Sequence, residues 1–251
     1  MERRVERGLV LRYADNKESD KVLTVLTHRM GRLTVIAKGA KSRRSRISAA
    51  AQQFAYSEFT LSESHGWQYA LEANTLHLFD GIRQDVILLS LANYLGELTE
   101  AVTCEESEGG EILSLLLNAL YALDTLKRPP ELVRSVFELK LMARTGFEPL
   151  VEVCAVCGAE QPREPQFDLR GGILCCGHCG GGMPLTEGAL AAMRHILYGE
   201  PGRLFHFTLD DGSQRSLSRA AEQYVVAMLE RNFSSLDFYK SLRCREDRVS
   251  R

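Results

Sequence analysis

The sequence lacks the long apolar segments that membrane-spanning and secreted proteins carry. No run of about 18 consecutive apolar residues occurs, so a transmembrane helix is not expected. Residues 1–20 have no apolar core and mix acids with bases, which is atypical of a secretory signal. In the reducing cytosol that these absences favour, the seven cysteines indicate metal ligation or free thiols rather than disulfides. We predict a cytoplasmic protein with no membrane partner.

The usual motifs of catalysis are missing as well. The chain has no G-x-x-x-x-G-K-[ST] loop, the common signature of ATP hydrolysis. It has neither the G-x-S-x-G motif of serine hydrolases nor the H-E-x-x-H motif of zinc proteases. The six histidines are scattered singly rather than grouped. We therefore predict that the protein is not an enzyme.

What the chain does have is two close pairs of cysteines, Cys154 with Cys157 and Cys176 with Cys179. Two C-x2-C pairs joined by a short loop suit a tetrahedral Zn²⁺ site, because a two-residue spacer lets both thiolates reach one ion from a single turn. Gly158, directly after the first pair, allows the positive φ that such turns need. A closed site of four cysteines is far more often structural than catalytic. We predict one structural zinc ion held by these four residues.

Cys175 leaves the second pair open to other interpretations. Cys175 could pair with Cys179, or could combine with His178 in a site of three cysteines and one histidine. The cysteines could also be redox-active or simply buried. We prefer Cys176 with Cys179 because this choice repeats the spacing of the first pair.

The net charge of −2 hides an uneven distribution. Residues 1–46 hold thirteen Lys or Arg and five acids, a net charge of +8, so the rest of the chain carries −10. Such asymmetry indicates a basic N-terminal module, suited to nucleic acid, on an acidic body.

Positive charge is densest in segment 38–46, which has five cations and no acid. Its arginines and lysines can neutralise phosphates, and Ser42 and Ser45 can donate hydrogen bonds to phosphate oxygens. The alternative is a solvated surface loop. However, the segment follows a predicted strand of a small β-barrel, described below, and this position favours nucleic-acid binding. We predict phosphate contacts from Lys38, Lys41, Arg43, Arg44 and Arg46, with Arg29 and Arg32 of the adjoining hairpin as second choice.

Residues 5–79 show short runs rich in β-branched and apolar residues. Five such runs in under 80 residues predict a small β-barrel such as an OB-fold, although an SH3-like barrel would have the same composition. The predicted strands are 5–12, 21–26, 32–38, 54–62 and 67–79. Six aromatic residues are candidates for stacking on bases, although barrel aromatics are more often core: Tyr13, Phe54, Tyr56, Phe59, Trp67 and Tyr69.

After residue 80 the apolar residues recur at helical spacing. Proline before residue 131 and glycine after residue 144 are typical of a helix start and end. Thr186 and either Ser216 or Ser218 are candidate N-caps. The predicted helices are 86–102, 112–126, 131–144, 186–198 and 216–233.

Several motifs, in the same order along the chain, resemble those of the bacterial recombination mediator family RecO. The motifs are Gly8-Leu-Val-Leu-Arg-Tyr13, Ala37-Lys-Gly-Ala40, the segment Phe137–Pro149, Cys154-x2-Cys157-Gly158, and Gly171-Gly172 before the second cysteine pair. The chain departs from the family at one point. There the double glycine usually leads to a single C-x2-C, whereas here Cys175 precedes Cys176.

This resemblance implies an α+β protein with an N-terminal OB-fold barrel and a C-terminal α-helical domain with an inserted four-cysteine zinc module. The implied domains are 1–80, the OB-fold; 81–149, the first helical part; 150–183, the zinc module; and 184–251, the second helical part. The implied function is mediation of DNA repair and homologous recombination in the cytoplasm, associated with the nucleoid. The family binds single- and double-stranded DNA and anneals complementary strands. With RecR it helps to load RecA, an indirect partner, on DNA coated by single-stranded-DNA-binding protein.

Two other functions compete with this one. A zinc-ribbon protein of RNA binding or transcription would contact nucleic acid through the metal module, but residues 154–182 hold two arginines against three acids. A net negative module is a poor phosphate binder. A metal-dependent hydrolase would need an open position on the metal, which four cysteines do not leave.

Overall fold

The computed structural model describes residues 3–105 and 108–249. They form two compact units: the described residues as far as Thr125 together with those from Ser235, and residues 126–234. The units divide the chain differently from the predicted domains, whose boundaries stay a prediction. Within the described part of the chain, no helix combines the length and the apolar character that crossing a membrane requires.

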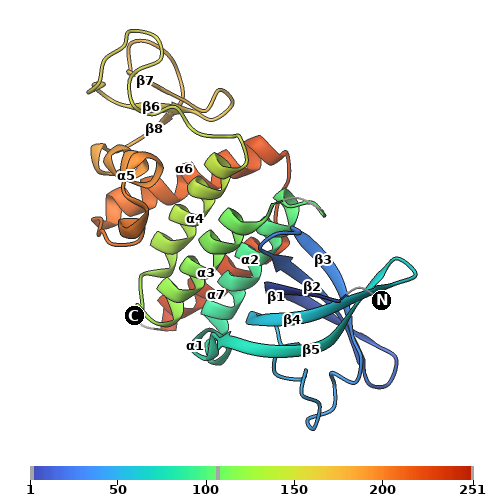
Figure 1. Ribbon diagram of the computed structural model, residues 1–251. Coiled ribbons are helices and arrows are strands. Elements are labelled where there is room, and N and C mark those ends of the chain that lie inside the picture. The colour runs from blue at the N-terminus through green and yellow to red at the C-terminus, as the bar shows by residue number, and fades with distance from the viewer. Residues whose placement is uncertain (1–2, 106–107, 250–251) are drawn as a thin grey trace. The chain divides into compact units, whose positions relative to one another are not determined.

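The first unit is built on a closed five-stranded barrel with the strand order β1-β2-β3-β5-β4 (Figure 1). Neighbouring strands are antiparallel except β3 and β5, which pair in parallel. This confirms the predicted OB-fold barrel. The strands are β1 (Arg3–Asn16), β2 (Asp20–Thr27), β3 (Arg32–Ala37), β4 (Ala55–Ser64) and β5 (Trp67–Leu78). β1 is longer than predicted because it pairs with β4 along its first half and with β2 along its second.

Residues 38–54 connect β3 to β4 as a chain of turns rather than as a helix or strand. The amide of Ser42 donates to the carbonyl of Gly39 (3.1 Å), and the amide of Ser45 donates to the carbonyl of Ser42 (3.0 Å). One side of the segment packs into the barrel core through Ala40, Ile47, Ala50 and Ala51. The basic segment is therefore an ordered surface with an apolar base.

Four helices complete the first unit: α1 (Asp80–Gln84), α2 (Val86–Val102), α3 (Gly110–Asp124) and α7 (Ser234–Val249). α2 begins where predicted because the Asp85 carboxylate accepts hydrogen bonds from the amides of Ile87 and Leu88 (2.8 and 3.1 Å). α2 and α3 both contact strand β1. α3 also contacts β2, so these helices pack against the side of the barrel that β1 and β2 form.

The second unit contains helices and a small sheet with the order β7-β6-β8. Its elements are α4 (Pro130–Arg144), β6 (Gln166–Asp168), β7 (Ile173–Cys175), β8 (Met183–Pro184), α5 (Glu187–Tyr198), the 3-10 helix η1 (Pro201–Arg203) and α6 (Asp211–Leu229). The predicted cap Thr186 is confirmed, since its hydroxyl accepts from the amide of Ala189 (3.1 Å). The predicted caps of the last helix of this unit, Ser216 and Ser218, are wrong. Asp210 caps α6 earlier, accepting from the amide of Ser213 at 2.9 Å.

A buried ion-pair network joins α4 and α6. The Arg134 side chain is only 3% exposed, and its guanidinium contacts carboxylates of Glu131 (2.8 Å), Glu138 (2.9 Å) and Glu222 (3.4 Å). Glu138 is fully buried. Burial alone would lower the pKa of Arg134, but the surrounding carboxylates raise it, so the guanidinium stays charged. No sequence motif pointed to this network.

Candidate metal centre and nucleic-acid surface

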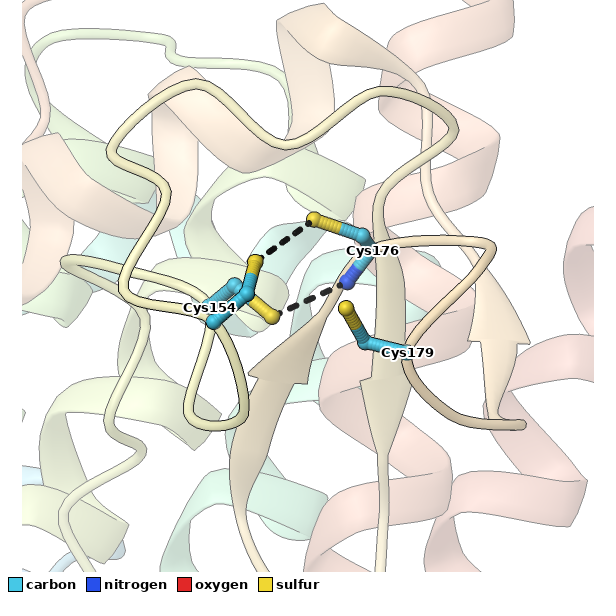
Figure 2. A group of neighbouring side chains, drawn as sticks. Cys154, Cys176 and Cys179 are labelled. Carbon is cyan, nitrogen blue, oxygen red and sulfur yellow. Dashed lines mark hydrogen bonds between the residues drawn. The ribbon is translucent and has the colours of Figure 1, made fainter.

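The thiols of Cys154, Cys157, Cys176 and Cys179 meet at one point in the second unit. Their sulfur atoms all lie within 4.8 Å of one another, and the Sγ atoms of Cys157 and Cys176 are 3.6 Å apart. Four thiolates around a tetrahedral zinc ion would lie about 3.8 Å apart, whereas a disulfide requires about 2.05 Å. Figure 2 shows the sulfurs of Cys154, Cys176 and Cys179 directed toward one another from two separate turns. The spacing fits a metal ion and not a disulfide.

Local backbone geometry forms each cysteine turn. In the first turn, the amide of Gly158 donates to the carbonyl of Cys154 (2.9 Å), and Gly158 has the positive φ of 75° expected at this position. In the second, the amide of Cys179 donates to the carbonyl of Cys176 (3.0 Å). The first turn is joined to the sheet because the Ala155 amide donates to the Leu174 carbonyl (2.8 Å). The sheet thus brings two distant cysteine pairs together.

The thiols have unequal proton affinities. The backbone amide of Cys157, with those of Val156 and Cys176, lowers the pKa of the Cys154 thiol to about 6. Burial, followed by hydrogen bonding to Cys157, raises the pKa of Cys176 to about 12. A hydrogen bond with Cys157, followed by burial, raises that of Cys179 to about 11. Four thiolates this close repel one another, and a divalent cation would compensate that repulsion. The donor set is closed and soft, which fits zinc in a structural role.

Cys175 lies beside this cluster but not in it. It is the last residue of β7 and pairs with Gln166 of β6. Its thiol is buried, and burial raises its pKa. His178 is exposed and also lies outside the cluster. The geometry therefore favours Cys176 over Cys175 as the ligand.

Alanine substitution of the two adjacent cysteines tests this assignment. We expect Cys176→Ala to lose most of its bound zinc, since only three thiolates remain, while Cys175→Ala keeps one zinc ion per chain. Metal content measured by mass spectrometry, before and after a chelator challenge, distinguishes the two variants. Zinc lost from Cys175→Ala and kept by Cys176→Ala would reverse the assignment.

Arg194 of α5 holds the first cysteine turn in place. Its guanidinium donates to the backbone carbonyls of Val151 (2.8 Å), Glu152 (2.7 Å) and Glu160 (2.6 Å). The sequence did not point to this residue, because nothing in its local pattern distinguishes it from a surface arginine. Its three bonds attach the cysteine module to the helices of the same unit.

The predicted basic segment forms part of the barrel surface in the first unit. Lys38, Arg43, Arg44 and Arg46 are exposed. Lys41 is half-buried and engaged, since its ammonium lies 3.2 Å from the Asp15 carboxylate and donates to the Lys17 carbonyl (3.0 Å). Four of the five cations therefore face solvent, and the fifth ties the segment to the β1–β2 turn.

The β1–β2 turn also fixes the backbone of the basic segment. The Asp20 carboxylate accepts from the Gly39 amide (2.8 Å), and this bond lowers the pKa of Asp20. The Ser19 carbonyl accepts from the Lys41 amide (3.0 Å). The exposed cations therefore project from a backbone that is already ordered.

The second-choice arginines lie elsewhere. Arg32 begins β3, whereas Lys38 follows its end, so the strand separates them. Arg29 contacts the Glu6 carboxylate (3.1 Å) and donates to the Val5 carbonyl (2.8 Å). Arg32 donates to the Glu100 carbonyl (2.7 Å). Both are engaged within the first unit, and they do not join the basic segment.

The candidate stacking residues divide by burial. Phe54 and Phe59 are buried in the core, and Tyr56 is half-buried on β4. Tyr13 is exposed, but the Lys21 ammonium lies 3.7 Å from its ring centroid. On β5, Trp67 is exposed and Tyr69 is half-buried.

Known proteins resemble the chain over nearly its whole length. The family model described as Recombination protein O N terminal matches residues 1–79, and that described as Recombination protein O C terminal matches residues 83–237. A DNA repair protein RecO of Acetivibrio thermocellus is 29% identical over 240 residues, which cover 94% of this chain and 95% of the relative. That of Symbiobacterium thermophilum is 30% identical over 243 residues, 94% of this chain and 96% of the relative. That of Exiguobacterium sibiricum is 34% identical over 171 residues, 68% of each.

Proposed function

Because the chain belongs to the RecO family, whose role is in DNA repair and recombination, we propose that it binds single- and double-stranded DNA and anneals complementary strands. The main observation in support of this proposal is the basic segment, where four exposed cations project from an ordered backbone on an OB-fold barrel. Cations in such a place bind phosphates without covering the edges of the bases. Annealing requires this, because two anionic strands must approach while their bases stay free to pair.

The proposed DNA contacts are Lys38, Arg43, Arg44 and Arg46, with Lys41 as a cation that also anchors the segment. Arg29 and Arg32 stay a second choice, since their present contacts would have to be exchanged for phosphate. This ranking follows from existing contacts and not from exposure, since Arg29 is exposed but contacts Glu6.

We propose that the cysteine module has a structural role and holds one zinc ion through Cys154, Cys157, Cys176 and Cys179. The close approach of the four thiols and the anchoring by Arg194 support this role. A closed set of four thiolates leaves no position for a substrate, which agrees with a protein that acts without catalysis.

The partners that the family implies are RecR, single-stranded-DNA-binding protein and, indirectly, RecA. In this proposal the protein acts in the cytoplasm at the nucleoid and makes DNA coated by single-stranded-DNA-binding protein accessible to RecA. In this proposal the basic segment binds phosphate, and the surfaces that bind partner proteins lie on other parts of the chain.

A zinc-ribbon RNA-binding or transcription factor is the alternative. It would require the cysteine module to contact nucleic acid, yet this module exposes Glu160 and Glu164 beside Arg163 and Arg170. Mixed charge of this kind gives little attraction to phosphate.

Annealing of complementary strands tests the proposal. The wild-type protein should accelerate pairing of two complementary oligonucleotides coated with single-stranded-DNA-binding protein, followed by energy transfer between dyes on the two strands. Binding to DNA without acceleration of pairing would favour the alternative function, and absence of DNA binding would reject the proposal.

A further inference from the structure

An aromatic residue is presented to solvent at the tip of the β4–β5 hairpin. Trp67, the single tryptophan of the chain, is 52% exposed. It directly follows a two-residue turn, in which His65 and Gly66 have φ values of 52° and 76° and Ser64 pairs with Trp67. Two positive φ values are typical of a type I′ turn, which closes a hairpin tightly. The indole is thus held beside the two-residue turn of a hairpin and not on a long loop.

Tyr69 continues the same surface. Residues two apart on a strand point to the same side, about 7 Å apart along the strand, so Trp67 and Tyr69 share the outer face of β5 while Ala70 is buried. β3 runs beside this face in parallel, with Ile36 opposite Tyr69. The two rings therefore form an aromatic strip along β5, with Trp67 exposed and Tyr69 half-buried.

The strip leads into the basic segment. The Lys38 ammonium lies 4.9 Å from the centroid of the Tyr69 ring. At the other end, the acid beside the turn, Glu63, is compensated by the guanidinium of Arg4 (3.4 Å) and the amide of Gln68 (3.0 Å). A ligand lying on this strip meets aromatic rings first and cations next, an order that suits a flat group joined to an anionic backbone.

We propose that Trp67 stacks on an unpaired base of single-stranded DNA whose backbone continues past Tyr69 and Lys38 toward the arginines of the basic segment. The proposal rests on the proposed function and adds a distinction to it. Phosphate contacts attract both single strands and duplexes, whereas stacking requires a base that is not already stacked within a duplex. Stacking by Trp67 would then favour single strands over duplexes.

Fluorescence of the single tryptophan tests this directly. A thymidine oligonucleotide should quench Trp67 emission as it binds. An abasic oligonucleotide of equal length and charge, and a blunt duplex, should bind without comparable quenching. In Trp67→Ala, affinity for the thymidine oligonucleotide should fall by about 5- to 100-fold. Affinity for the abasic oligonucleotide and for the duplex should change by less than about twofold, and the dependence of affinity on salt should stay the same, because no charge is removed.

Two further variants serve as controls. Trp67→Phe should recover part of the lost affinity because it restores an aromatic ring, and Leu76→Ala, an exposed apolar residue of the same strand, should bind like the wild type. Binding of the thymidine oligonucleotide with unchanged emission and unchanged affinity of Trp67→Ala would overturn the inference and leave the proposed function standing. Equal losses for all three probes would also overturn it. Absence of binding to every probe would reject both.

Discussion

Replacement of Arg43, Arg44 and Arg46 by glutamate should lower the affinity for DNA by about 100-fold or more at moderate salt. All three side chains are exposed on an ordered segment whose buried side, including Ala40 and Ile47, is left unchanged. Removing one contact with a phosphate should reduce the slope of log affinity against log salt by about 0.9 for duplex and about 0.7 for single strands. Fluorescence anisotropy of labelled oligonucleotides, titrated at several salt concentrations, measures both quantities.

A matched control separates a local effect from a change in overall charge. Arg170, Arg215 and Arg219 are exposed arginines of the second unit, and their replacement by glutamate changes the net charge by the same amount. This control should keep most of the affinity and the full salt slope. Equal losses in both triple variants would show that overall charge, and not the basic segment, carries the binding. Circular dichroism should show that both variants are folded.

The sequence predicts correctly the features that are encoded within a few neighbouring residues. The run of β-branched and apolar residues at 32–38 predicts a barrel strand, and the structure confirms β3 there with Leu33, Val35 and Ala37 buried. The spacing of Cys154 and Cys157 identifies a turn that can present two thiols to one ion. In both cases the information lies within a few residues of the chain.

The sequence is less informative about contacts between side chains that lie far apart along the chain. The sequence predicts phosphate contacts from Arg29 and Lys41, but it does not show that Glu6 and Asp15 of β1 engage these two side chains. α6 begins earlier than predicted, because Asp210 caps it and neither Ser216 nor Ser218 does.

The buried network around Arg134 is likewise marked by no sequence motif. Its loss should have a large effect on stability. Replacing Arg134 by Met should lower the free energy of unfolding of the second unit by about 3–5 kcal/mol, because the buried Glu138 carboxylate would lose its 2.9 Å contact with the guanidinium. The guanidinium also meets Glu131 and Glu222, so one substitution leaves three acids facing one another. Urea denaturation followed by far-ultraviolet circular dichroism suits the measurement, since Trp67 fluorescence reports only on the first unit.

A compensating double variant distinguishes the loss of a counter-charge from the loss of packing. In Arg134→Met with Glu138→Leu, both buried charges are removed together, and most of the lost stability should return, because paired burial of charge is often replaceable by apolar side chains. Arg219→Met, on the exposed face of α6, should change stability by no more than about 0.5 kcal/mol. If the double variant were no more stable than Arg134→Met alone, packing by the arginine stem would be the main contribution. Charge compensation is the stronger expectation, because Arg134 is 3% exposed and three carboxylates converge on its guanidinium.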